Sequence, residues 1–142
     1  METAIQHLTK HGIRPSVQRV AIMQYLMEHR THPTVDMIYN DLLKTVPTLS
    51  RTTVYNTLEL LAHSHAIRTL NIDKRNVRYD GIVEPHAHFM CSRCGKIADV
   101  DLDSHLKAHL LAEHDFRVEQ VELNYTGVCS DCLAHDAETT QN

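Results

Sequence analysis

The chain of 142 residues has few glycines and prolines, four of each, and contains no low-complexity tract. No apolar run approaches the roughly 18–20 residues that cross a bilayer. The N-terminal METAIQHLTKHG has no apolar segment of the kind that directs secretion. Repeats of solenoid or propeller length are also absent from the sequence. We therefore expect a cytoplasmic protein with no membrane partner.

Charge is distributed unevenly along the chain, although the net charge is only −4. Residues 1–79 hold ten Lys and Arg against six Asp and Glu, whereas residues 80–142 hold four against twelve. All four cysteines lie in the acidic part. A basic front and an acidic, Cys-containing back predict two modules with separate tasks. We place them at residues 1–80 and 86–142, joined by a hinge at residues 81–85.

The first module has the pattern of a winged helix-turn-helix. Capping residues and apolar spacing predict helices over residues 3–11, 16–28, 34–46 and 50–64. Two strands are predicted at residues 66–72 and 77–80, around a polar turn at residues 73–76. In this arrangement the last helix enters the major groove of DNA and the hairpin lies along the backbone.

The outward part of the last predicted helix carries polar side chains suited to DNA. Arg51 can hold a phosphate, Asn56 can pair with adenine, and Tyr55 can pack on a thymine methyl. The candidate contacts on this helix are Arg51, Thr52, Thr53, Tyr55, Asn56 and Thr57. Two other interpretations remain open, because such a face can simply be solvated and helix-turn-helix domains also bind proteins.

Two Cys-x-x-Cys motifs stand in the second module, Cys91 with Cys94 and Cys129 with Cys132. Each motif can turn two thiolates toward one point, and two motifs complete the tetrahedral sulfur coordination of structural zinc. A pair of disulfides and a redox-active motif are the alternatives. A chain without an export signal favours zinc. Four protein ligands leave no open position, so this zinc would contribute folding energy.

A second cluster of metal-binding residue types precedes and follows the first motif. His86 and His88 point to the same side of a strand, and Asp99 follows on the strand after the motif. Asp80 closes the predicted wing just before the hinge. Imidazole and carboxylate ligands without sulfur favour Fe²⁺ or Mn²⁺, with Zn²⁺ still possible. The sequence thus predicts a closed thiolate site and an exchangeable nitrogen and oxygen site.

The rest of the second module is predicted to be a helix over residues 103–114 and a strand over residues 116–126. That strand is a candidate edge for a homodimer, because small helix-turn-helix proteins commonly bind two-fold sites as dimers. The remaining histidines show no partner pattern and are expected at the surface. They are His7, His11, His29, His63, His65, His105, His109, His114 and His135.

Nearly the whole chain resembles the ferric uptake regulator (Fur) family of bacterial metalloregulators. The segments that carry the resemblance are GIRPSVQR, HPTVDMIY, SRTTVYNTLELL, HAHFMCSRCGKIADV and YTGVCSDC. The resemblance implies an α+β fold, with an N-terminal winged helix-turn-helix domain and a C-terminal α/β dimerisation domain that carries a structural zinc site of four cysteines. It also implies double-stranded DNA with an AT-rich inverted repeat as the partner, and it adds Arg14 to the DNA-binding residues.

Within the family, the sequence looks most like the peroxide-sensing (PerR) branch. The regulatory Fe²⁺ or Mn²⁺ ligands implied by that branch are His32, Asp80, His86, His88 and Asp99. Iron-responsive members usually have Glu at the positions of Asp80 and Asp99, and often VYR where this chain has VYN at residues 54–56. The branch implies that peroxide oxidises His32 or His86 and so ends repression. The alternative within the family is an iron- or manganese-responsive repressor without peroxide sensing.

Two other classes of function compete with a repressor. A small metallohydrolase could use the His86 and His88 pair, but no acid stands beside these ligands as an obvious general base. We therefore expect no enzyme. A thiol-redox switch could release zinc when the four cysteines oxidise. Mass spectrometry separates this switch from histidine oxidation, because it would find disulfides rather than a gain of one oxygen on histidine peptides.

Overall fold

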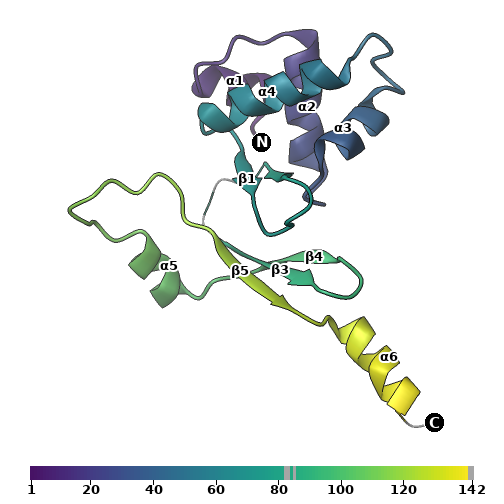
Figure 1. Ribbon diagram of the computed structural model, residues 1–142. Helices are drawn as coiled ribbons and strands as arrows, with labels where there is room; N and C mark the ends of the chain where they lie inside the picture. Colours follow the sequence, from purple (N-terminus) through teal and green to yellow (C-terminus); the bar gives the residue numbers. More distant parts are fainter. Residues whose placement is uncertain (82–83, 85, 141–142) are drawn as a thin grey trace. The chain divides into compact units, whose positions relative to one another are not determined.

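The computed structural model describes residues 1–81, 84 and 86–140 (Figure 1). The chain divides into two compact units, Met1–Val83 and Glu84–Asn142. Of the hinge predicted at 81–85, residues 82, 83 and 85 lie outside the described residues. In the described part, unit 1 has helices followed by a two-stranded sheet, and unit 2 has a three-stranded sheet and two helices. The fold is α+β, as predicted.

Four helices build most of unit 1: α1 (Ala4–Lys10), α2 (Val17–Glu28), α3 (Val35–Leu42) and α4 (Arg51–His63). Each begins after a Ser or Thr whose side chain accepts a hydrogen bond from a backbone N–H of the first turn. The N-caps that the sequence predicts before α2, α3 and α4 are confirmed: Ser16, Thr34 and Ser50. The predicted C-terminal end of α2 is also observed, whereas the predicted bounds of α3 and α4 extend past the observed ends, most of all for α3.

Helix α4 packs one face into the core of unit 1. Val54, Leu58 and Leu61 are fully buried, which confirms the inward face predicted for them. Thr57 is buried too, so its assignment to the outward face was wrong. Thr57 lies three residues after Val54 and four before Leu61, and this spacing places it on the same face of the helix.

A two-stranded antiparallel sheet ends unit 1, formed by β1 (Arg68–Leu70) and β2 (Arg78–Asp80). Both strands are shorter than predicted. The first begins late because the chain is still closing the end of α4 at Ala66, whose N–H donates to the carbonyl of Leu61. His65 adopts a positive φ of 62° and reverses the chain there, an arrangement that commonly ends helices.

Unit 2 contains a mixed sheet in the order β4-β3-β5. Strand β3 (Ala87–Cys91) pairs antiparallel with β4 (Ile97–Val100) and parallel with β5 (Leu123–Gly127). Two helices accompany the sheet, α5 (Ser104–Leu110) and α6 (Ser130–Thr140). Helix α6 is not among the elements expected from the sequence.

The strand predicted at residues 116–126 was wrong over its first part. The ladder with β3 begins only at Leu123, and residues 111–120 are all exposed. The alternating apolar residues Phe116 and Val118 face solvent in the single chain. A strand forms only where it finds a ladder partner, so an apolar alternation alone did not determine its length.

Unit 2 buries little apolar surface. Among its described residues, only Ala87, Cys91, Cys129 and His88 are buried. Two of these are cysteines of the predicted zinc site and one is a predicted metal ligand. A unit with so small a core needs another source of stability, such as a metal or a partner subunit.

His7 on α1 is buried, with 7% of its surface exposed, so its assignment to the surface was wrong. Its Nε2 donates to the carbonyl of Ala66 at 2.7 Å, and its Nδ1 lies 3.0 Å from a carboxylate oxygen of Glu2. His7 thus ties the first helix to the chain that leaves α4.

None of the described helices combines the length and apolarity needed to cross a bilayer.

We expect His7→Ala to lower the free energy of unfolding by about 1–3 kcal/mol, because it leaves the buried Ala66 carbonyl without its donor. Urea denaturation followed by circular dichroism measures the change. The exposed His63 supplies the control, since His63→Ala should change stability by less than about 0.5 kcal/mol. Equal effects of the two variants would contradict the structural role of His7.

Candidate metal centres and nucleic-acid interface

The four cysteines of unit 2 gather into one cluster, in which every sulfur lies within 4.8 Å of the others. The Sγ atoms of Cys91 and Cys132 are 3.8 Å apart, and those of Cys94 and Cys129 are 3.7 Å apart. None of the four forms a disulfide. Tetrahedral zinc with Zn–S bonds of about 2.3 Å separates its sulfurs by roughly 3.75 Å. The cluster therefore fits structural zinc.

Backbone hydrogen bonds stabilise the thiolate form of Cys91. The N–H groups of Cys94 and Cys129 donate to its Sγ at 3.5 and 3.4 Å, and these donors lower the pKa of Cys91 to about 5. The pKa of Cys132 is raised to about 12, because its thiol is hydrogen-bonded to neighbouring sulfurs, Cys129 first, and is withdrawn from water. Zinc ligation displaces the remaining thiol protons.

Three of the predicted regulatory ligands meet within unit 2. The Nε2 atoms of His86 and His88 each lie 3.4 Å from the same carboxylate oxygen of Asp99. The sheet register explains this placement, since His88 on β3 stands opposite Asp99 on β4. Donors around an ion at about 2.0–2.2 Å lie roughly 3.0–3.5 Å from one another. The three groups therefore fit a metal ion.

The tautomer of His86 agrees with a ligand role. Its Nδ1 donates to the carbonyl of Glu84 at 2.8 Å. In a neutral ring, this leaves the lone pair on Nε2, the atom that faces Asp99. Ligand histidines in metal sites use their second nitrogen in this way, which fixes the ring orientation.

The other two predicted ligands meet within unit 1. His32 Nε2 lies 3.7 Å from Asp80 Oδ2, and both side chains are almost fully buried, at 2% and 4% exposed. His32 comes from the loop between α2 and α3, and Asp80 ends β2. No spacing pattern in the sequence connects these two residues. Only the family resemblance included His32 among the ligands.

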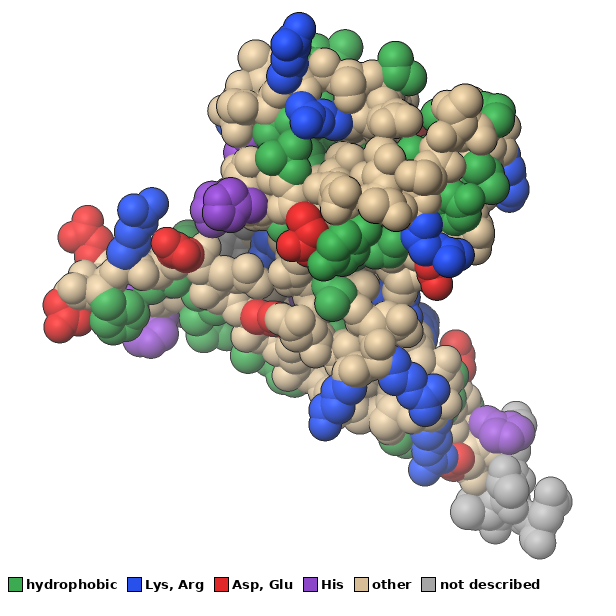
Figure 2. All heavy atoms as spheres, turned by 45° about the horizontal axis from the view of Figure 1, so that its top comes forward, with side chains coloured by type: hydrophobic (Ala, Val, Ile, Leu, Met, Phe, Trp, Pro, Cys, Tyr) green, Lys and Arg blue, Asp and Glu red, His purple; other side chains and the backbone are tan. Residues whose placement is uncertain are grey.

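The predicted DNA-binding residues of α4 lie mostly at the surface. Arg51, Thr52, Tyr55 and Asn56 are exposed, and Thr53 is half-buried. The Arg51 guanidinium pairs with Asp36 at 3.0 Å and lies over the ring of Tyr39. Asp36 therefore orients the cation that was expected to hold a phosphate. On the face shown in Figure 2, Lys and Arg side chains stand in small separate groups, and Asp or Glu side chains lie beside some of them.

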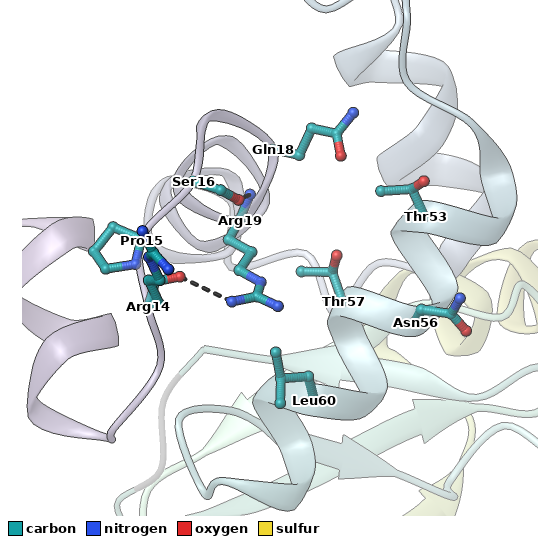
Figure 3. A pocket seen from close by; sticks show the side chains of 9 residues that line it. All are labelled: Arg14, Pro15, Ser16, Gln18, Arg19, Thr53, Asn56, Thr57 and Leu60. Atoms are coloured by element: carbon teal, nitrogen blue, oxygen red, sulfur yellow. Dashed lines mark hydrogen bonds between the residues drawn. The ribbon is translucent and has the colours of Figure 1, made fainter.

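Arg14 lines a pocket of about 450 Å³ in unit 1, and residues of α4 line the same pocket. The pocket is lined from the segment before α2, from the start of α2 and from α4 (Figure 3). Sequence reasoning missed two of its polar residues, Gln18 and Arg19. The Arg19 guanidinium donates to the carbonyl of Arg14 at 3.0 Å. Two cations and several hydrogen-bonding side chains at one hollow suit a phosphate backbone.

Comparison with known proteins identifies the family. The profile of the Ferric uptake regulator family matches residues 10–126, which is most of the chain. The chain belongs to the ferric uptake regulator family. It is 35% identical over 134 residues to the peroxide-responsive repressor PerR of Staphylococcus epidermidis, covering 93% of this chain and 89% of that protein.

Solved structures of the family agree with this assignment. PerR from Streptococcus pyogenes, described in a study of peroxide sensing and gene regulation, is 30% identical, with a TM-score of 0.52 over 93% of this chain and 94% of that one. The ferric uptake regulator of Helicobacter pylori has a TM-score of 0.72 over 93% and 95% of the chains, and at 22% identity it supports the fold alone.

We expect Cys94→Ser to remove zinc, and with it the fold of unit 2, because the small apolar core cannot replace four metal bonds. Elemental analysis measures the zinc, and size-exclusion chromatography follows assembly. Ser92→Ala is the matched control, since Ser92 lies in the same motif and its hydroxyl donates to the Gly127 carbonyl. A stable, zinc-free Cys94→Ser protein would refute the assignment of this cluster.

Proposed function

We propose that this protein is a metal-dependent transcriptional repressor that senses hydrogen peroxide and thereby derepresses oxidative-stress genes. The observation that carries the proposal is the meeting of His86, His88 and Asp99 at distances that suit an ion, without sulfur. Such donors bind Fe²⁺ or Mn²⁺. The curated relatives named as peroxide-responsive repressors match 93% of the chain, which favours peroxide sensing over a response to metal alone.

One regulatory Fe²⁺ or Mn²⁺ ion would be bound by both units. His32 and Asp80 of unit 1 would supply two ligands, and His86, His88 and Asp99 of unit 2 the other three. An ion bound by both units favours one relative orientation of them, and in a dimer that orientation sets the spacing of the two α4 helices. Metal then promotes DNA binding because it binds the DNA-competent state better than the open state.

Peroxide acts on the ligands rather than on the zinc cysteines. When bound, iron supplies the redox chemistry that activates peroxide, whereas manganese supplies coordination alone. One oxygen atom of peroxide is added to the imidazole of His32 or His86, and the other leaves as water. The oxidised ring ligates metal poorly, so the units separate and the operator is released. Zinc-bound thiolates are poor nucleophiles and stay unchanged.

The DNA partner is proposed to be an AT-rich inverted repeat bound by a homodimer in the cytoplasm. Asn56 reads adenine and Tyr55 contacts a thymine methyl, while Arg14 and Arg51 bind phosphates. Dimerisation would cover the exposed apolar residues Phe116, Val118 and Tyr125 and extend the sheet from the β5 edge. The protein has no enzymatic activity in this proposal, because its ligands serve a switch.

Loading the protein with Fe²⁺ or Mn²⁺ tests this function. One dose of peroxide should release operator DNA from the iron form and leave the manganese form bound, as measured by fluorescence anisotropy. Peptide mass analysis should find a gain of one oxygen on His32 and His86 in the iron form only. Fragmentation is needed to localise it, since tryptic peptides 31–44 and 79–93 also contain Met37 and Met90. Release without histidine oxidation would refute the mechanism.

Asp99→Glu keeps the charge and ligand type but adds one methylene, which changes how the carboxylate approaches the ion. We expect this variant to repress with iron and yet to stay on DNA after peroxide, with little oxygen on His32 or His86. The exposed Asp101 provides the control, because Asp101→Glu should respond as the wild type does. If Asp99→Glu also senses peroxide normally, the Asp-for-Glu difference does not set the response.

A further inference from the structure

Arg78 on β2 joins two parts of unit 1 that lie far apart in the sequence. Its Nη1 donates to the carbonyl oxygen of His32 at 3.2 Å, across 46 residues of chain. Its Nε and Nη2 both lie 3.1 Å from the same carboxylate oxygen of Asp73. The Arg78 side chain is only 18% exposed. With three nitrogens engaged, the guanidinium is held in one orientation.

Asp73 anchors this arginine and also shapes the wing turn. Its second oxygen accepts a hydrogen bond from the backbone N–H of Arg75 at 2.9 Å, the arrangement of an Asx turn. The Arg75 N–H, together with the guanidinium of Arg78, holds the pKa of Asp73 below its ordinary value. The carboxylate is therefore ionised near neutral pH, and the ion pair to Arg78 is present there.

The main chain at His32 needs support from its surroundings. Its φ of 55° lies in the left-handed region, which residues other than glycine rarely adopt. Two consecutive residues of β2 hold the loop: Arg78 through the His32 carbonyl, and Tyr79 through an N–H that donates to the Pro33 carbonyl at 3.0 Å. The next residue of the strand, Asp80, is the one that faces the His32 ring.

We infer that Arg78, held by Asp73, is the positioning residue that fixes the His32 loop for metal binding. This inference rests on the proposed function, in which His32 is a regulatory ligand. Arg78 contacts His32 through its main-chain carbonyl, so the imidazole ring of His32 is available to bind the ion. It sets where that ring stands relative to Asp80, and its pairing with Asp73 links the ligand loop to the basic wing turn.

Arg78→Lys tests the inference, because lysine keeps the charge but cannot span the His32 carbonyl and Asp73 together with a planar group. The probe is Mn²⁺ alone, titrated into the zinc-loaded protein and followed by the electron paramagnetic resonance signal of free Mn²⁺. We expect Mn²⁺ affinity to fall by about 10–100-fold, the range typical for residues that orient ligands. Zinc content should stay at the wild-type value, because the cysteine cluster lies in unit 2.

Arg75→Lys is the matched control, since Arg75 is exposed on the same turn and its contact with Asp73 is made by the backbone. It should bind Mn²⁺ as the wild type does. Asp73→Asn provides a second variant in case Arg78→Lys folds poorly, and it should lower Mn²⁺ affinity in the same direction. After iron loading and peroxide, Arg78→Lys should also shift oxidation from His32 toward His86.

Wild-type Mn²⁺ affinity in both Arg78→Lys and Asp73→Asn would overturn this inference, as would an equal loss in Arg75→Lys. A failure of the proposed function looks different. There, the wild-type protein itself would bind no Mn²⁺ at these residues, or would bind operator DNA equally with and without metal.

Discussion

The four-thiolate cluster is the constraint on which unit 2 depends. The unit buries few side chains, and two of them are cysteines of this cluster. The cluster draws the end of β3, the turn after it and the start of α6 to one point. Strand β3 is thereby fixed, and with it His88, whose register places it opposite Asp99, a second proposed ligand of the regulatory ion. A structural metal site thus supports a second site of different chemistry a few residues away.

The two sites differ in donor softness, and this difference keeps their functions apart. Thiolates select zinc and hold it in a closed shell, whereas imidazoles and carboxylates accept exchangeable Fe²⁺ or Mn²⁺. The distances between donor atoms also differ between the two sites. Cysteine sulfurs lie 3.7 and 3.8 Å apart, whereas the histidine Nε2 atoms lie 3.4 Å from the carboxylate oxygen of Asp99. A sensor that exchanges one ion while keeping another needs such a separation.

Unit 1 is stabilised differently, by an apolar core between capped helices. In the proposed function its sensing element is the short strand β2, where consecutive residues have distinct tasks. Arg78 and Tyr79 hold the loop of His32, and Asp80 faces its ring. The same strand leads back to the wing turn through Asp73. In the proposed function, the strand therefore connects the metal ligands of unit 1 with the turn of the hairpin.

The sequence by itself determined the local features of this protein. Side-chain caps placed the helix starts, and apolar spacing indicated the inward face of α4. Two Cys-x-x-Cys motifs marked the cysteine cluster, and a His-x-His pair marked the two histidines that lie beside Asp99. These signals are local because they act within one turn of helix or two positions of a strand. His32 was reached only through family resemblance, since no spacing connects it to Asp80.

Only the tertiary structure decided the contacts between residues distant in sequence. It buried His7 against Ala66 and brought Arg78 to the carbonyl of His32. It also delayed the start of β5 to Leu123, because a ladder needs a partner that periodicity does not specify. The physical reason is the same in each case: a hydrogen bond made across dozens of residues depends on how whole elements pack, and the local pattern does not specify that packing.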